Sequence, residues 1–189
     1  DSMLAVIYGT LLKWVVLFSP LIIFFVFVVM INRLSAAGAQ LFFYFYAALM
    51  GLSISFIFAI YTGFSITQTF LVTSVSFAGL SLYGYTTKKN LSGFGSFLIM
   101  GLIGLIVASI VNIFLASGAL AFAISVIGVL IFAGLTAYDT QRIKTDYIAH
   151  AHAMDSEWLA KSAIMGALNL YLDFVNLFMF LLSFLGNQE

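Results

Sequence analysis

Long apolar runs, interrupted by short polar breaks, form the pattern of this chain. Residues 21–31, LIIFFVFVVMI, are continuously apolar and lack the alternating polarity of a membrane-spanning β-strand. A hydrocarbon layer of about 30 Å is crossed by about 20 helical residues. The pattern therefore predicts an all-α, polytopic membrane bundle in one domain, residues 1–189, with six spans at 14–31, 39–61, 66–85, 91–115, 119–143 and 163–185.

The positions of the charged residues support this prediction. No charge lies between Lys13 and Arg33, between Arg33 and Lys88, or between Lys89 and Asp139. Only 7% of the residues are charged, whereas soluble proteins carry about 25%. The net charge of zero offers no basic surface for nucleic acid, and the absence of cysteine excludes thiol catalysis and thiolate metal sites. The lipid bilayer is the expected surrounding.

The basic residues also predict an orientation, because Lys and Arg in short loops favour the cytoplasmic side. Six of them lie at the end of the first, third or fifth predicted span or in the connection after it, and Lys13 alone lies on the other side. We expect those three connections in the cytoplasm, with the polar stretch 144–162 as the longest, and the C-terminus outward. The six residues are Arg33, Lys88, Lys89, Arg142, Lys144 and Lys161.

An aspartate inside the last predicted span is the first candidate for chemistry. Asp173 stands in NLYLDFVNLF, residues 169–178, and an ionised Asp at the bilayer centre costs about 2.5–3.5 kcal/mol. Asn169 and Asn176 lie four residues before and three after it, so the three side chains share one helix face. Such a polar stripe should turn inward. The alternative is a polar clamp between helices.

Asp139, near the end of the fifth predicted span, is the natural partner of Asp173. Two facing carboxylates cannot both ionise cheaply, so the pair would act as a pH-sensitive element. Together with asparagine carbonyls, Asp139 and Asp173 are also oxygen ligands of the kind that Ca²⁺ takes. The alternative for Asp139 is an interfacial ion pair with Arg142 or Lys144.

The two aspartates differ in their predicted depth. At about 1.5 Å per residue, Asp173 lies about 18 Å from Lys161 and Asp139 about 7 Å from Lys144. The carboxyl groups meet only if the cytoplasmic half is a water-filled vestibule, if the fifth helix continues beyond the membrane, or if the helices tilt differently.

Arg33 ends the first predicted span on the same side as Asp139. We weigh two roles for it: an anchor at the membrane surface, and an ion-pair latch to Asp139. The latch would be closed when Asp139 is charged and released when it is protonated. Small residues, Gly104-xxx-Ala108 with Gly128 and Gly134, predict that neighbouring helices approach closely.

Three segments together resemble the transmembrane Bax inhibitor-1 motif family, in particular its bacterial members. They are TTKKNLSGFGSFLIMGLIGL, AYDTQRIK and LNLYLDFVNLF, in this order along the chain. The resemblance implies seven helices, six of them around a central last helix. The last predicted span would be that helix, and the family's first helix is expected to be missing from this sequence.

The resemblance also implies a function. Members are associated with pH-sensitive calcium leak, with cytoprotection and, for some bacterial relatives, with restraining a membrane protease. By position, Asp139 and Asp173 match the family's sensor aspartates, and Arg33 matches the basic cluster at the inner end of its second helix.

We therefore expect a pH-modulated Ca²⁺ leak in the inner membrane of a bacterium, with Ca²⁺ and H⁺ as its partners, and no enzyme. One alternative is an interaction protein that regulates a membrane protease or another membrane complex. A further alternative is proton-coupled transport or intramembrane proteolysis by an aspartate dyad. The signatures of such proteases, Y-D and G-x-G-D, are only half met by Tyr138 and Asp139.

Overall fold

The computed structural model describes residues 12–187, and the regular elements of this range are helices. They are α2 (Leu12–Met30), α3 (Ala36–Ile54), α4 (Ile57–Ile60), α5 (Gly63–Thr86), α6 (Ser92–Leu115), α7 (Gly118–His150) and α8 (Ser156–Leu185). Five segments in this part of the chain are long and apolar enough to cross a membrane, with α3 and α4 counted as one. The prediction of a polytopic helical membrane protein is confirmed.

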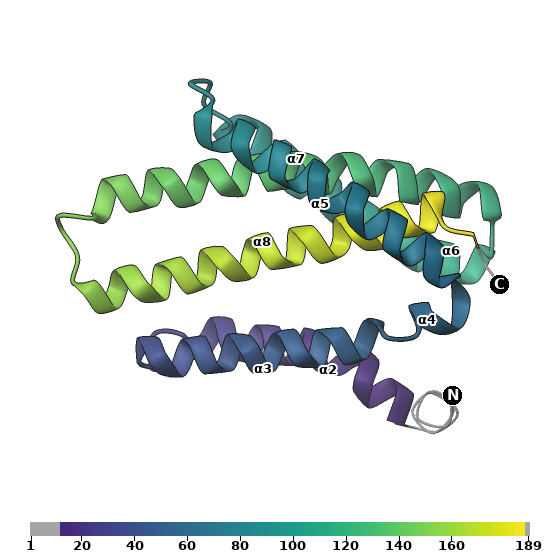
Figure 1. Cartoon of the computed structure of the whole chain (residues 1–189), viewed down its shortest axis with the longest axis horizontal. Helices are drawn as coiled ribbons and strands as arrows, with labels where there is room; N and C mark the ends of the chain where they lie inside the picture. The colour runs from purple at the N-terminus through teal and green to yellow at the C-terminus, as the bar shows by residue number, and fades with distance from the viewer. Residues whose placement is uncertain (1–11, 188–189) are drawn as a thin grey trace.

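The last helix lies in the middle of the bundle. Figure 1 shows α8 between the α2–α3 pair and a layer formed by α5, α6 and α7. Helix α8 packs against α3, α5 and α7. In the apolar 18-residue stretch of α8, 33% of the residues are buried, against 11–28% in the corresponding stretches of the other four segments. The expectation of a central last helix is therefore confirmed.

The prediction that residues 144–162 form a long polar connection is wrong. Helix α7 continues to His150 and α8 begins at Ser156, so only residues 151–155 connect them. The Asp155 side chain accepts a hydrogen bond of 2.7 Å from the Trp158 N–H and so caps α8. Arg142 with Asp146, and Glu157 with Lys161, form pairs one helical turn apart. Polar residues therefore extend α7 and α8 beyond their apolar, membrane-spanning stretches.

The second predicted span, 39–61, is also not one continuous helix. Helix α3 ends at Ile54, and α4 begins at Ile57. The Ser55 hydroxyl donates a hydrogen bond of 2.7 Å to the Leu52 carbonyl, and such local side-chain bonds compete with the helical ladder.

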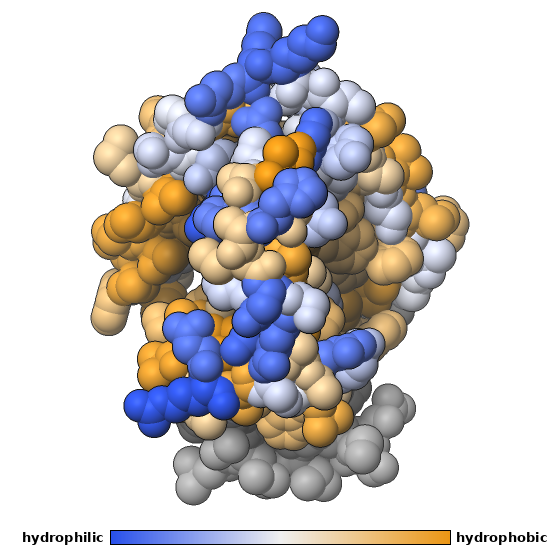
Figure 2. All heavy atoms as spheres, turned by 90° about the vertical axis from the view of Figure 1, so that its left-hand side faces the viewer, coloured by the Kyte–Doolittle hydropathy of each residue, from blue (hydrophilic) through white to orange (hydrophobic). Residues whose placement is uncertain are grey.

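The charged residues gather at one end of the bundle. The connections α2–α3, α5–α6 and α7–α8 lie at that end, and the α6–α7 connection and the end of α8 lie toward the other (Figure 1). We call it the charged end and define it by residues 31–35, 87–91 and 151–155. Figure 2 looks at it from outside and shows its hydrophilic residues. The six basic residues named above lie in or beside these connections.

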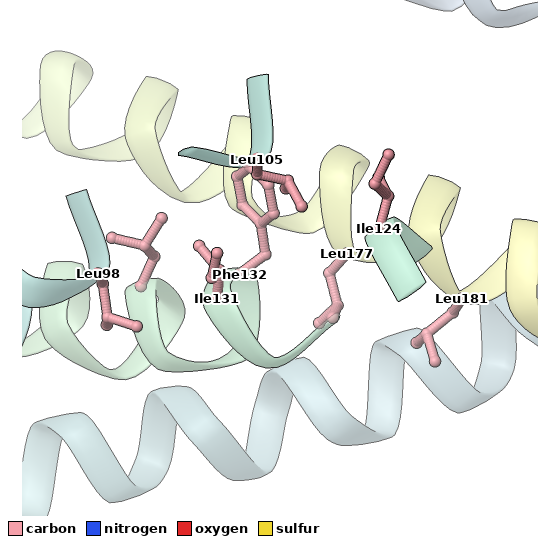
Figure 3. Packing of buried hydrophobic residues seen from close by; sticks show 8 residues of the cluster. Leu98, Leu105, Ile124, Ile131, Phe132, Leu177 and Leu181 are labelled. Carbon is pink, nitrogen blue, oxygen red and sulfur yellow. The ribbon is translucent and has the colours of Figure 1, made fainter. Parts of the chain in front are cut away.

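The apolar core joins α6, α7 and α8. Figure 3 shows Leu98 and Leu105 of α6 with Phe132 of α7 and Leu177 and Leu181 of α8. Their helices approach closely because glycines replace side chains at the contacts. A Cβ at Gly128 would lie 2.7 Å from the Phe180 ring, and one at Gly134 would lie 2.7 Å from Leu98.

The close approach predicted at Gly128 and Gly134 is therefore confirmed. The one predicted at Gly104 is wrong, because a Cβ there would meet no atom within 4 Å. Two contacts that we did not predict are tighter still. A Cβ at Gly84 would overlap the Ala137 carbonyl, and one at Gly95 would overlap the Tyr138 ring.

We predict that Gly84→Ala lowers the free energy of unfolding in detergent by about 1–3 kcal/mol, the usual cost of overpacking. The new methyl group would meet backbone atoms of α7, which cannot rotate away. Gly79→Ala on the same helix is the matched control, because its methyl group meets nothing within 4 Å. Equal stability of the two variants would contradict close α5–α7 packing at Gly84.

Candidate functional site

Asp173 lies deep inside the bundle on α8. Its side chain is only 4% exposed, and no donor from residues 12–187 reaches its Oδ2 atom. A buried carboxylate without a donor is expensive in free energy. The site must therefore supply a proton or a positive charge.

Asp139 of α7 is the polar group that faces Asp173. The two carboxyl groups lie within hydrogen-bonding reach of each other, and Asp139 is partly buried. Ionised carboxylates only accept hydrogen bonds. Contact at this range therefore requires a proton on one of them, or a cation between them.

The contact follows from the packing of α7 against α8. The helices run in opposite directions, and on one side of the pair Ser125 and Ser183 share a hydrogen bond of 3.0 Å. On the other side, a Cβ at Gly166 would lie 2.8 Å from Ile143, so glycine lets the helices approach there. Helix α7 continues seven residues beyond Ile143, where the predicted span ended. Of the three conditions under which the two carboxyl groups could meet, this fulfils the second, a fifth helix that continues beyond its apolar stretch.

Two pockets meet at the carboxyl pair. The end pocket, of about 500 Å³, lies between the polar extensions of α7 and α8. The side pocket, of about 630 Å³, lies among α6, α7 and α8 and has mainly apolar walls. Both are lined by Asp139, Arg142 and Asn169, and the side pocket also reaches Asp173. The pair is therefore accessible from the charged end.

The asparagines of the predicted polar stripe line these pockets. Asn169 borders both, and Asn176 borders the side pocket. The Asn176 amide donates a hydrogen bond of 2.8 Å to the Leu172 carbonyl of its own helix. This bond uses the nitrogen and leaves the side-chain carbonyl oxygen as an acceptor.

Calcium binding by Asp139 and Asp173 stays a prediction. Residues 12–187 hold no cluster of three or more His, Cys, Asp or Glu side chains. A cation at the pair would therefore depend on two carboxylates, with asparagine carbonyls as the further oxygen ligands.

Arg33 lies apart from the pair. It occupies the exposed turn after α2, and the ion pairs found within residues 12–187 are Arg142–Asp146, at 3.8 Å, and Lys161–Glu157, at 3.9 Å. The latch between Arg33 and Asp139 stays a prediction that needs another arrangement of α2 and α3. Arg142 is the arginine that lines both pockets with Asp139. Its position three residues after Asp139, on the same helix face, is the signal that would have identified it.

Sequence reasoning also missed an anchor beside Asp139. The Gln141 side chain accepts a hydrogen bond of 2.9 Å from the Leu91 N–H and donates one of 2.8 Å to the Lys89 carbonyl. Lys144 donates to the Tyr85 carbonyl at 2.7 Å, and its ammonium lies 4.7 Å from the centre of the Tyr85 ring. Two side chains of α7 thus hold the α5–α6 connection in place within about one and a half turns of Asp139.

Comparison with known proteins identifies the family. The family model described as "Inhibitor of apoptosis-promoting Bax1" matches residues 2–189. The chain belongs to the Bax inhibitor-1 family. The predicted resemblance is confirmed over nearly the whole sequence.

Bacterial relatives of this Bax inhibitor-1 family chain are similar over most of its length. An uncharacterized protein of Caulobacter vibrioides is 52% identical over 95% of this chain and 71% of its own length. One of Rickettsia prowazekii is 48% identical over 93% of this chain and 73% of its own. The inner membrane protein YbhL of Escherichia coli is 51% identical over 85% of this chain and 68% of its own.

We predict that Gln141→Ala increases amide hydrogen exchange at residues 89–91, because both side-chain bonds to the connection are lost. A loss of about 1 kcal/mol per bond corresponds to about fivefold faster exchange for each. Gln141→Glu is the matched comparison, since it keeps an acceptor for Leu91 and loses the donor to Lys89. An Ala variant that exchanges no faster than the parent would show that Gln141 is not the anchor.

Proposed function

We propose that this membrane protein provides a passive, pH-modulated leak for cations such as Ca²⁺, and that the Asp139–Asp173 pair gates it. The observation that carries the proposal is the meeting of two carboxyl groups where the end pocket and the side pocket join. This role needs a pathway and a titrating group and no catalytic centre.

The chemistry of the pair suits a gate. Without a shared proton, the carboxylates repel each other and attract a divalent cation, for which Asn169 and Asn176 add oxygen ligands. With one proton, they hydrogen-bond to each other and the site loses a negative charge. A change in pH thus alters both the charge and the contact between α7 and α8.

In our proposal, apolar packing along α8 closes the pathway. On the side away from the charged end, α8 is packed with apolar side chains, among them Leu177, Leu181 and Leu182. These residues are at most 9% exposed. Passage of an ion therefore requires movement of α8 relative to its neighbours.

We place the charged end in the cytoplasm, because its connections carry the basic residues. The C-terminus would then face outward. By analogy with YbhL, whose name describes an inner membrane protein, we place the chain in the inner membrane of a bacterium.

We predict that Asp173→Asn abolishes the pH dependence of Ca²⁺ flux into liposomes. The parent flux should change as the pH falls from 8 to 6, because protonation of the Asp139–Asp173 pair alters its charge and the contact between α7 and α8. In the Asp173→Asn variant no proton can be shared between two carboxyl groups, so its flux should be the same at pH 8 and at pH 6. An unchanged pH response in this variant would refute the gate.

Glu157→Gln is the control, because it removes an exposed carboxylate at the same end of the bundle that lines neither pocket. It should behave like the parent. If the parent protein gives no flux above empty liposomes at any pH, the leak is refuted. Regulation of a membrane protease then becomes the better hypothesis for the function.

We further predict that Arg33→Ala raises the leak at neutral pH by up to about fivefold, because an exposed ion pair is worth up to about 1 kcal/mol. Arg142→Ala is the comparison, since Arg142 lines the end pocket beside Asp139. An increase with Arg142→Ala alone would assign the latch to Arg142 and leave Arg33 as a surface anchor.

A further inference from the structure

A third pocket, of about 630 Å³, lies at the charged end between the α5–α6 connection and α7. We call it the basic pocket. Its lining includes four cationic side chains, Lys88, Lys89, Arg142 and Lys144, and one carboxylate, Asp146. This excess of positive charge attracts an anion.

Two of the four cations are already engaged. Lys144 donates to the Tyr85 carbonyl, and Arg142 pairs with Asp146 at 3.8 Å. Lys88 and Lys89 are exposed, and neither forms an ion pair within the described part of the chain. These two ammonium groups are therefore available to a ligand.

The backbone around the basic pocket is suited to the same ligand. Helix α6 begins there at Ser92, and the N–H groups of its first turn beyond Ser92 add partial positive charge. The hydroxyls of Thr87 and Ser92 also line the pocket. Gln141 holds the connection on α7, and the Asn90 side chain accepts a hydrogen bond of 2.9 Å from the Ser92 N–H. A site fixed in this way needs little ordering when a ligand binds.

We infer that the basic pocket binds a phosphate group. Lysine is a strong ligand for phosphate, and basic pockets at the cytoplasmic ends of membrane helices bind anionic lipid headgroups. The pocket lies where α5 ends and α6 begins, which is the level of a bilayer surface. The source of the phosphate is an anionic phospholipid or a soluble phosphate. The inference does not depend on the proposed leak.

The test uses the protein in nanodiscs of phosphatidylcholine, with and without phosphatidylglycerol, and in a third sample with inorganic phosphate instead. Hydrogen exchange of residues 87–93 and lipid retention in native mass spectrometry are the readouts. A bound phosphate should slow exchange at these residues. Protection by phosphatidylglycerol alone identifies a lipid headgroup, and protection by inorganic phosphate identifies a soluble ligand. No protection in either sample refutes the inference.

Single substitutions locate the site. Lys88→Gln and Lys89→Gln should each weaken binding about tenfold, because each removes a charge-assisted hydrogen bond to the phosphate. Arg33→Gln removes the same charge at the same end but outside the basic pocket, and it should not change binding. Lys88→Arg should keep binding near the parent level. An equal loss with Arg33→Gln would refute a defined pocket and indicate general surface attraction.

Discussion

The close antiparallel packing of α7 against α8 is the constraint on which the rest of the structure depends. Glycines at positions 128 and 166 let the helices approach on either side of Asp139 and Asp173. Asp173 is buried without a donor, and a proton that it shares with Asp139 removes the cost of an isolated charge there. The same contact opens onto the end pocket and the side pocket. An apolar pair would stabilise the bundle equally well but would not respond to protons.

The sequence was sufficient to predict the helices but not where they end. A bilayer forces backbone groups to bond within a segment, so long apolar runs must be helical. Hydropathy marks the edge of the membrane, whereas a helix ends where its capping groups are satisfied. Residues 144–162 were therefore misjudged, because the Asp155 cap and the pairs one turn apart extend α7 and α8 into polar surroundings. The break at Ser55 was missed for the converse reason, since it lies inside an apolar run.

Within the site, residue types were predictable and distances were not. Asp173 is conspicuous because a carboxylate in an apolar span is rare, and Asn169 and Asn176 follow from helical spacing alone. Contact between Asp173 and Asp139 depends on how far α7 extends, which hydropathy does not report. Arg33 and Arg142 illustrate the same limit, because both lie at the charged end but only Arg142 lines the pockets at Asp139. Gly104 and Gly128 are equally small, but only Gly128 faces a neighbouring helix.

Helix α7 brings two sites of opposite charge within about two turns of each other. Asp139 faces Asp173, whereas Gln141 and Lys144 bind the α5–α6 connection and the end of α5. Arg142 borders all three pockets, so the negative charge of a phosphate in the basic pocket would offset part of the positive potential that Arg142 exerts on Asp139. Linkage makes this effect reciprocal: the charge on the carboxyl pair then changes the affinity for phosphate by the same factor. The two sites would therefore act as one electrostatic unit, with α7 as the rigid element that joins them.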